Sequence, residues 1–71
     1  MKKIAINTDS IELGQFLKWA DLASTGGEAK SMIKKGNVIV NGEIEKRRST
    51  TLSSADIVEV AGAKYQIIVN S

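Results

Sequence analysis

Apolar residues recur along this chain with a helical period in its first half and a strand-like pattern in its second half. The helical period predicts, first, a short amphipathic helix. The first set is spaced three and four residues apart, as on one face of a helix: Leu13, Phe16, Leu17 and Ala20. Asp9 lies three residues before Glu12, which is the spacing of a capping box. We therefore expect this helix to begin after Asp9 and to end near Asp21.

A second short helix is predicted between Thr25 and Gly36. Thr25 and Glu28 have the capping-box spacing again, and Gly36 is placed to end the helix in the left-handed conformation. The apolar face of this helix would be formed by Ala29, Met32 and Ile33. The two helices would then meet through a tight turn at residues 24–27.

β-branched residues dominate the second half of the chain and predict a small sheet. Residues 38–44 contain an Asn-Gly pair between two apolar runs, the strongest short-range signal of a β-hairpin. Two further strands are expected at residues 57–60 and 65–69, joined by a short turn. The predicted fold class is α+β, with two short packed helices against a small, mostly antiparallel sheet.

The register of the predicted hairpin has two solutions. A two-residue loop would pair Ile39 with Ile44, whereas a three-residue loop would pair Val40 with Ile44. We favour the three-residue loop, because it buries Val38 and Val40 together on one face.

Composition limits the chemistry that the chain can perform. With 71 residues it is long enough for a single small domain, residues 1–71. It contains no histidine and no cysteine, which argues against zinc and haem sites and thiol or serine–histidine nucleophiles. We expect a non-enzymatic protein with no cofactor, metal or small-molecule substrate. Because no apolar run is long enough for export or a membrane span, we expect a cytoplasmic protein. We also expect it to be a monomer.

Positive charge is concentrated in the middle of the chain. The net charge is only +2, but residues 18–48 hold seven of the ten basic residues. Two clusters stand out: Lys30, Lys34 and Lys35 on the second helix, and Lys46, Arg47 and Arg48 after the hairpin. Since the helix leads directly into the hairpin, we expect the clusters to form one basic surface that binds phosphates.

Two features have both a structural and a binding interpretation. The Gly26-Gly27 pair could hold a phosphate on its backbone amides, although a plain turn is the more economical interpretation. Trp19 lies at the margin of the apolar stripe, where a half-buried core edge is favoured over stacking on a base.

The chain resembles the RNA-binding domain family named after small-subunit ribosomal protein four, and within it the small stand-alone bacterial members of the YaaA and YbcJ type. The similarity covers roughly residues 11–60. The segments that carry it are residues 13–20, residues 24–30, Ile33, Gly36, Val38, Val40-Asn41-Gly42 and Asp56. The family commonly has an arginine where this chain has Gly26, and a glycine where it has Ala55.

The resemblance implies the αL RNA-binding fold and contact with structured RNA, often ribosomal. It places the RNA-facing residues at the second helix and the hairpin: Thr25, Gly26, Lys30, Lys34 and Asn41. Lys35, on the second helix, and the basic segment after the hairpin, Lys46, Arg47 and Arg48, complete the predicted site.

We therefore predict an RNA-binding protein that contacts ribosomal RNA or an assembling ribosomal subunit through this surface. Two alternatives stay open. Residues 12–35 can also be interpreted as a helix-turn-helix that binds double-stranded DNA, and the modest net charge fits a module that docks on a ribosomal or regulatory protein.

Overall fold

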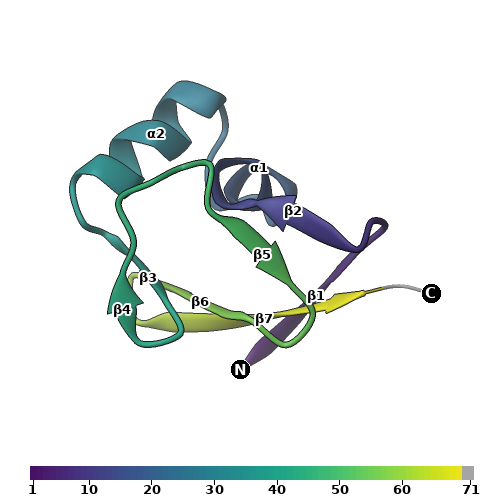
Figure 1. Ribbon diagram of the computed structural model, residues 1–71. Helices are drawn as coiled ribbons and strands as arrows, with labels where there is room; N and C mark the ends of the chain where they lie inside the picture. Colours follow the sequence, from purple (N-terminus) through teal and green to yellow (C-terminus); the bar gives the residue numbers. More distant parts are fainter. Residues whose placement is uncertain (70–71) are drawn as a thin grey trace.

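Two helices lie on one side of a five-stranded sheet, and a separate two-stranded ribbon joins the helices to the sheet (Figure 1). The computed structural model describes residues 1–69. In chain order the elements are β1 (Lys2–Ile6), β2 (Ser10–Glu12), α1 (Leu13–Trp19), α2 (Gly26–Lys34), β3 (Val38–Val40), β4 (Glu43–Ile44), β5 (Thr51–Ser53), β6 (Ile57–Val60) and β7 (Ala63–Val69). The predicted α+β class, with two helices against a mostly antiparallel sheet, is confirmed.

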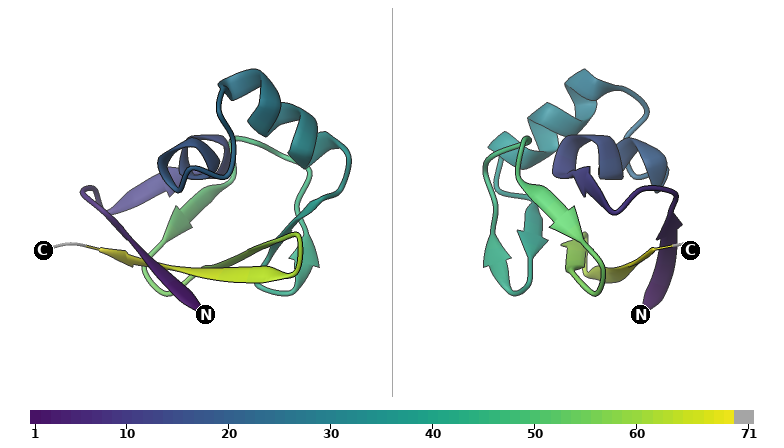
Figure 2. Two further views of the ribbon diagram at one scale, coloured as in Figure 1. Left: turned by 180° about the vertical axis from the view of Figure 1, so that it is seen from behind. Right: turned by 45° about the vertical axis from the view of Figure 1, so that its right-hand side comes forward.

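The five-stranded sheet has the strand order β1-β7-β6-β3-β4. β1 runs parallel to β7, and every other pair in this sheet is antiparallel. β2 and β5 form the antiparallel ribbon; β2 contacts α1, and β5 contacts β7. Figure 2 shows the helices together at one end of the molecule, with the β3–β4 hairpin and β1 at opposite edges of the sheet. β1, β2 and β5 were not predicted from the sequence.

The predicted capping box at the start of the first helix is wrong. Residues 10–12 are a strand that pairs with β5, and Glu12, the N-cap residue, makes no side-chain capping bond. The amides of Leu13 and Gly14 donate instead to the carbonyls of Thr50 and Arg48, at 2.8 and 3.0 Å. The start of α1 is therefore stabilised by the backbone of a distant segment rather than by Asp9.

The predicted signals for the second helix are confirmed. The amide of Glu28 donates to the Thr25 hydroxyl at 3.1 Å, and the Glu28 carboxylate accepts from the amide of Ser24 at 2.9 Å. Gly36 has φ +76°, and its amide donates to the carbonyl of Ile33, which ends the helix. Gly26 and Gly27 form the first turn of α2 instead of a connecting turn.

The hairpin has the two-residue loop, so the register that we favoured is wrong. Ile39 pairs with Ile44, and Val40 pairs with Glu43. Asn41 and Gly42 have φ of +50° and +87°, the two left-handed residues of a turn whose twist matches that of the flanking strands. This turn geometry, rather than burial, sets the register.

The core lies between the helices, the ribbon and the sheet. Every element except β2 and β4 contributes a buried side chain, and the buried apolar residues are Ile6, Leu13, Phe16, Leu17, Ala23, Ala29, Ile33, Val38, Leu52, Val58 and Ile67. Packing of α1 on α2 places the charged sides of both helices next to each other on the outer surface.

Candidate nucleic-acid interface

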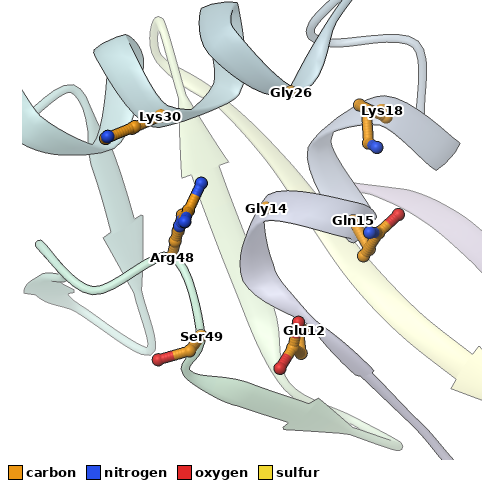
Figure 3. A pocket seen from close by; sticks show the side chains of 8 residues that line it. All are labelled: Glu12, Gly14, Gln15, Lys18, Gly26, Lys30, Arg48 and Ser49. Carbon is orange, nitrogen blue, oxygen red and sulfur yellow. The ribbon is translucent and has the colours of Figure 1, made fainter.

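A pocket of about 390 Å³ opens where α1, α2 and the segment after the hairpin meet (Figure 3). Three cationic side chains, from three different segments, line it: Lys18 of α1, Lys30 of α2 and Arg48. The other lining residues are Glu12, Gly14, Gln15, Gly26 and Ser49. We call this the basic pocket.

The backbone of Gly14 anchors Arg48 beside the basic pocket. A β-carbon on Gly14 would lie 3.5 Å from the β-carbon of Arg48 and 3.6 Å from its carbonyl oxygen, which is the oxygen that accepts from the Gly14 amide. Both are ordinary van der Waals distances, so the two segments pack closely at this point without excluding a β-carbon. In Figure 3 the Arg48 side chain extends from this anchor toward Lys30.

Lys18 completes the pocket and was absent from the predicted site. Its ammonium nitrogen lies 4.0 Å from the position that a β-carbon of Gly26 would take, at the first turn of α2. The sequence contains a signal that Lys18 is available for binding, because it lies off the apolar stripe of the first helix. Lys18 follows Gly14 by four residues and so shares its side of the helix. The predicted site rests on the clusters of the second helix and of residues 46–48, neither of which includes Lys18.

A carboxylate organises the loop that carries the second basic cluster. Glu45 accepts hydrogen bonds from the amides of Lys46 and Arg47 at 3.0 and 3.3 Å, and the Arg47 guanidinium lies 3.8 Å away. A hydrogen bond from the Thr50 hydroxyl, followed by that from the Arg47 amide, lowers the pKa of Glu45. The ionised carboxylate therefore holds residues 45–50 in the conformation that presents Arg48.

The structure brings the two predicted basic clusters together at both ends of α2. At the first turn, Lys30 and Arg48 share the basic pocket with Gly26. At the other end, a β-carbon on Gly36 would lie 3.9 Å from the Cε atom of Lys46. Lys34 is in the last turn of α2 and Lys35 is its C-cap, both exposed. We call the cationic set the basic surface: Lys18, Lys30, Lys34, Lys35, Lys46, Arg47 and Arg48.

Three predicted site residues have other local partners. The Thr25 hydroxyl caps α2, and Arg47 lies outside the pocket with its side chain 82% exposed. Asn41 is in the turn between β3 and β4, and Figure 1 shows this turn at the end of the hairpin away from α2. The Asn41 side chain donates to Asp56 at 3.1 Å and accepts from the amide of Ile57 at 2.9 Å. RNA contact at these positions stays a prediction.

The charge of the basic surface is largely uncompensated. Within residues 1–69, the single salt bridge is that between Arg47 and Glu45. Glu12 is the one carboxylate that lines the basic pocket, and Figure 3 shows it at the Ser49 end, away from Lys18 and Lys30. Such a surface attracts phosphate groups. The described part of the chain contains no cluster of three or more potential metal ligands among His, Cys, Asp and Glu, and none of its helices is long and apolar enough to span a membrane.

Comparisons of the sequence identify one family and one relative. The sequence model of a family described as the S4 domain matches residues 4–68. The chain is 42% identical over 66 residues to a Bacillus subtilis (strain 168) protein named "Probable ribosome maturation protein RlbA", covering 92% of this chain and 93% of that protein.

Two solved structures have a similar fold. The solution structure of YbcJ from E. coli, described as revealing an αL motif involved in RNA-binding, has a TM-score of 0.71 and 28% identity, over 96% of this chain and 87% of that one. The 30S ribosomal protein S4e from Thermoplasma acidophilum has a TM-score of 0.67 and 22% identity over 90% of this chain. The chain spans about a third of the length of S4e, 34%, and that similarity shows the fold alone.

Proposed function

Since the chain belongs to the S4 domain family, we propose that it binds structured RNA through the basic surface, without catalysing a reaction. The observation that carries the proposal is the convergence of Lys18, Lys30 and Arg48 on one pocket. Cations fixed on three segments match the backbone phosphates of a folded RNA better than one flexible cluster would. Binding of this kind recognises backbone and shape rather than sequence.

The RNA that we propose is ribosomal RNA, free or in an assembling ribosomal subunit. The support comes from the Bacillus relative, which covers nearly the whole chain and is named as a probable ribosome maturation protein, and from the αL motif of YbcJ. We propose that the protein acts in the cytoplasm as a single domain, where that RNA is found.

The test compares two triple variants with the same net charge. One carries Lys18→Gln, Lys30→Gln and Arg48→Gln in the basic pocket. The matched control carries Lys2→Gln, Lys3→Gln and Lys64→Gln, on β1 and at the start of β7, at the end of the molecule opposite the helices. Affinity for ribosomal RNA fragments is measured across a range of salt concentrations, after thermal unfolding has shown that both variants are folded.

The pocket variant should bind more weakly and with a shallower salt dependence. Removing one phosphate contact reduces the slope of log K against log salt by about 0.7 to 0.9, so removing all three would reduce it by roughly 2 to 3 units. The control should keep the slope of the unmodified protein. Equal slopes for the two variants would show that net charge, and not the pocket, governs binding.

Two further measurements separate the alternatives. Sedimentation of a cell lysate through sucrose should place the protein with ribosomal particles at low salt and release it at raised salt. Competition by duplex DNA as effective as that by structured RNA would favour a DNA-binding protein instead. Association with particles that survives high salt and nuclease would indicate docking on a protein.

A further inference from the structure

Trp19 is the single tryptophan of the chain, and it lies at the end of α1 with 52% of its surface exposed. Its indole nitrogen donates to the carbonyl oxygen of Ala5 in β1 at 2.7 Å. This hydrogen bond ties one edge of the ring to the sheet. A large aromatic surface is therefore held in a fixed orientation while about half of it remains accessible.

The ring borders two hollows on the surface of the molecule. One, of about 370 Å³, is lined by Ile11, Gln15, Lys18 and Trp19. The other, of about 160 Å³, is lined by Ile6, Asn7, Thr8, Ile11 and Trp19. Ile11 is shared by both, so the ring and this side chain form a continuous apolar surface between α1 and the β2 strand.

The larger hollow adjoins the basic pocket. Gln15 and Lys18 line both of them. Because Lys18 and Trp19 line the same hollow, an RNA phosphate held by Lys18 would lie beside the exposed ring of Trp19. This places a phosphate-binding group and an aromatic surface side by side, as in proteins that hold unpaired nucleotides by stacking.

We propose that Trp19 stacks an unpaired base of the bound RNA while Lys18 holds a phosphate next to that base. The proposal rests on the proposed function and adds to it the class of RNA: a folded RNA that presents an unstacked nucleotide beside a helical segment. The fixed ring lowers the cost of binding, because little side-chain freedom is lost when the base stacks. The stacking is tolerant of sequence, since every base has an aromatic face.

The test uses three RNA hairpins with the same stem: one fully paired, one with a single bulged adenosine and one with an abasic residue at the bulge. The abasic hairpin has the same bulged backbone without a base. Because Trp19 is the only tryptophan, intrinsic fluorescence reports on its ring alone. The unmodified protein should bind the adenosine bulge between about 5-fold and about 100-fold more tightly than the abasic bulge, with quenching for the adenosine bulge only.

Variants at position 19 separate stacking from a structural role. Trp19→Leu should bring the adenosine-to-abasic affinity ratio to about 1. Trp19→Phe loses the hydrogen bond to Ala5 but keeps an aromatic ring, and should retain part of the preference. Ile68→Ala is the matched control, because Ile68 is also apolar and exposed but lies on the face of β7 that points away from the core. It should keep the full ratio.

Two results would overturn the stacking site. One is equal affinity of the unmodified protein for the adenosine and abasic bulges; the other is a preference that survives Trp19→Leu. If binding to all three hairpins remains dependent on salt in either case, only the stacking proposal fails. If none of the hairpins binds, the proposed function fails with it.

Discussion

The ammonium nitrogen of Lys18 lies 4.0 Å from the position that a β-carbon of Gly26 would take, so a cation from α1 occupies the space beside the first turn of α2. The family resemblance implies an arginine at this place in many members. Here the positive charge comes from the neighbouring helix instead. The basic pocket thus keeps a cation beside α2 although position 26 itself has no side chain.

An arginine at position 26 should therefore rescue the loss of Lys18. Lys18→Gln is expected to weaken RNA binding and to reduce the salt slope by about 0.7 to 0.9, the value for one phosphate contact. Adding Gly26→Arg to this variant should restore most of the slope, measured by titration at several salt concentrations. If Gly26→Leu restored it equally well, the effect would come from helix stability rather than from charge.

Asn41 is expected to contribute to stability through its side chain. Asn41→Gly keeps the left-handed backbone but removes the bonds to Asp56 and to the amide of Ile57, and should lower the free energy of unfolding by about 1 to 2 kcal/mol. Asn41→Ala should cost about 1 kcal/mol more, because alanine disfavours φ of +50°. Urea unfolding curves measure both.

These two variants also test the predicted RNA contact of Asn41. Binding is compared at a temperature where both are fully folded. Unchanged RNA affinity would remove Asn41 from the interface, whereas weaker binding by the folded glycine variant would support a direct contact.

Ala55→Gly should stabilise the protein. Ala55 has φ +76°, in the left-handed region where a β-carbon is strained, and the family commonly has glycine at this place. We expect a gain of about 1 kcal/mol, seen as a rise in Tm of about 4 to 8 °C for a domain of this size. Ala63→Gly, in a strand, is the control and should lower Tm. A lower Tm for Ala55→Gly would mean that the strain is absent.

Acid should loosen the loop of residues 45–50. The pKa of Glu45 is lowered in the folded protein by its hydrogen bonds, the largest contribution coming from the Thr50 hydroxyl. A lowered pKa means that the carboxylate stabilises the fold above its unfolded pKa, and that this contribution is lost as pH falls through the folded value. The protection of the Lys46 and Arg47 amides, which is their hydrogen-exchange rate compared with that of an unfolded peptide at the same pH, should decrease over that range.

Glu45→Gln gives the matching experiment at neutral pH. The variant should show low protection of these two amides at every pH, so that its difference in protection from the unmodified protein disappears in acid. Glu43→Gln, two residues earlier and exposed on β4, is the control and should leave the exchange unchanged. Equal exchange in the unmodified protein and Glu45→Gln at neutral pH would contradict the role of the carboxylate.

The parts of the fold that could be predicted from sequence have local signals. Thr25 and Glu28, three residues apart, mark the start of α2, and Asn-Gly marks the hairpin. β2 and β5 have only three residues each, and Ser10 pairs with Ser53, far along the chain, so no local pattern announces them. Because residues 10–12 form β2, α1 begins only at Leu13, and Asp9 lies too far from its first turn to cap it. Pairing between distant segments therefore determines β2, β5 and the start of α1.

The error in hairpin register has a different cause. Val38 and Val40 are two residues apart on one strand, so they share a face whichever loop is used. Burial therefore could not distinguish the two registers, whereas the left-handed preference of Asn41 and Gly42 could.

The two basic clusters of the site could be predicted from local spacing in the sequence. Lys18 joins them only through the packing of α1 on α2, which no local pattern shows.

The position of β7 in the sheet has a consequence for the order of folding. This strand, residues 63–69, lies between β1 and β6 and is the one neighbour of β1 in the sheet. The helices and the hairpin form from contacts close in sequence, but β1 has no strand to pair with until β7 is in place. We expect a transition state with α1, α2 and the hairpin formed, and late docking of the first strand. With no proline in the chain, refolding should proceed without a slow isomerisation phase.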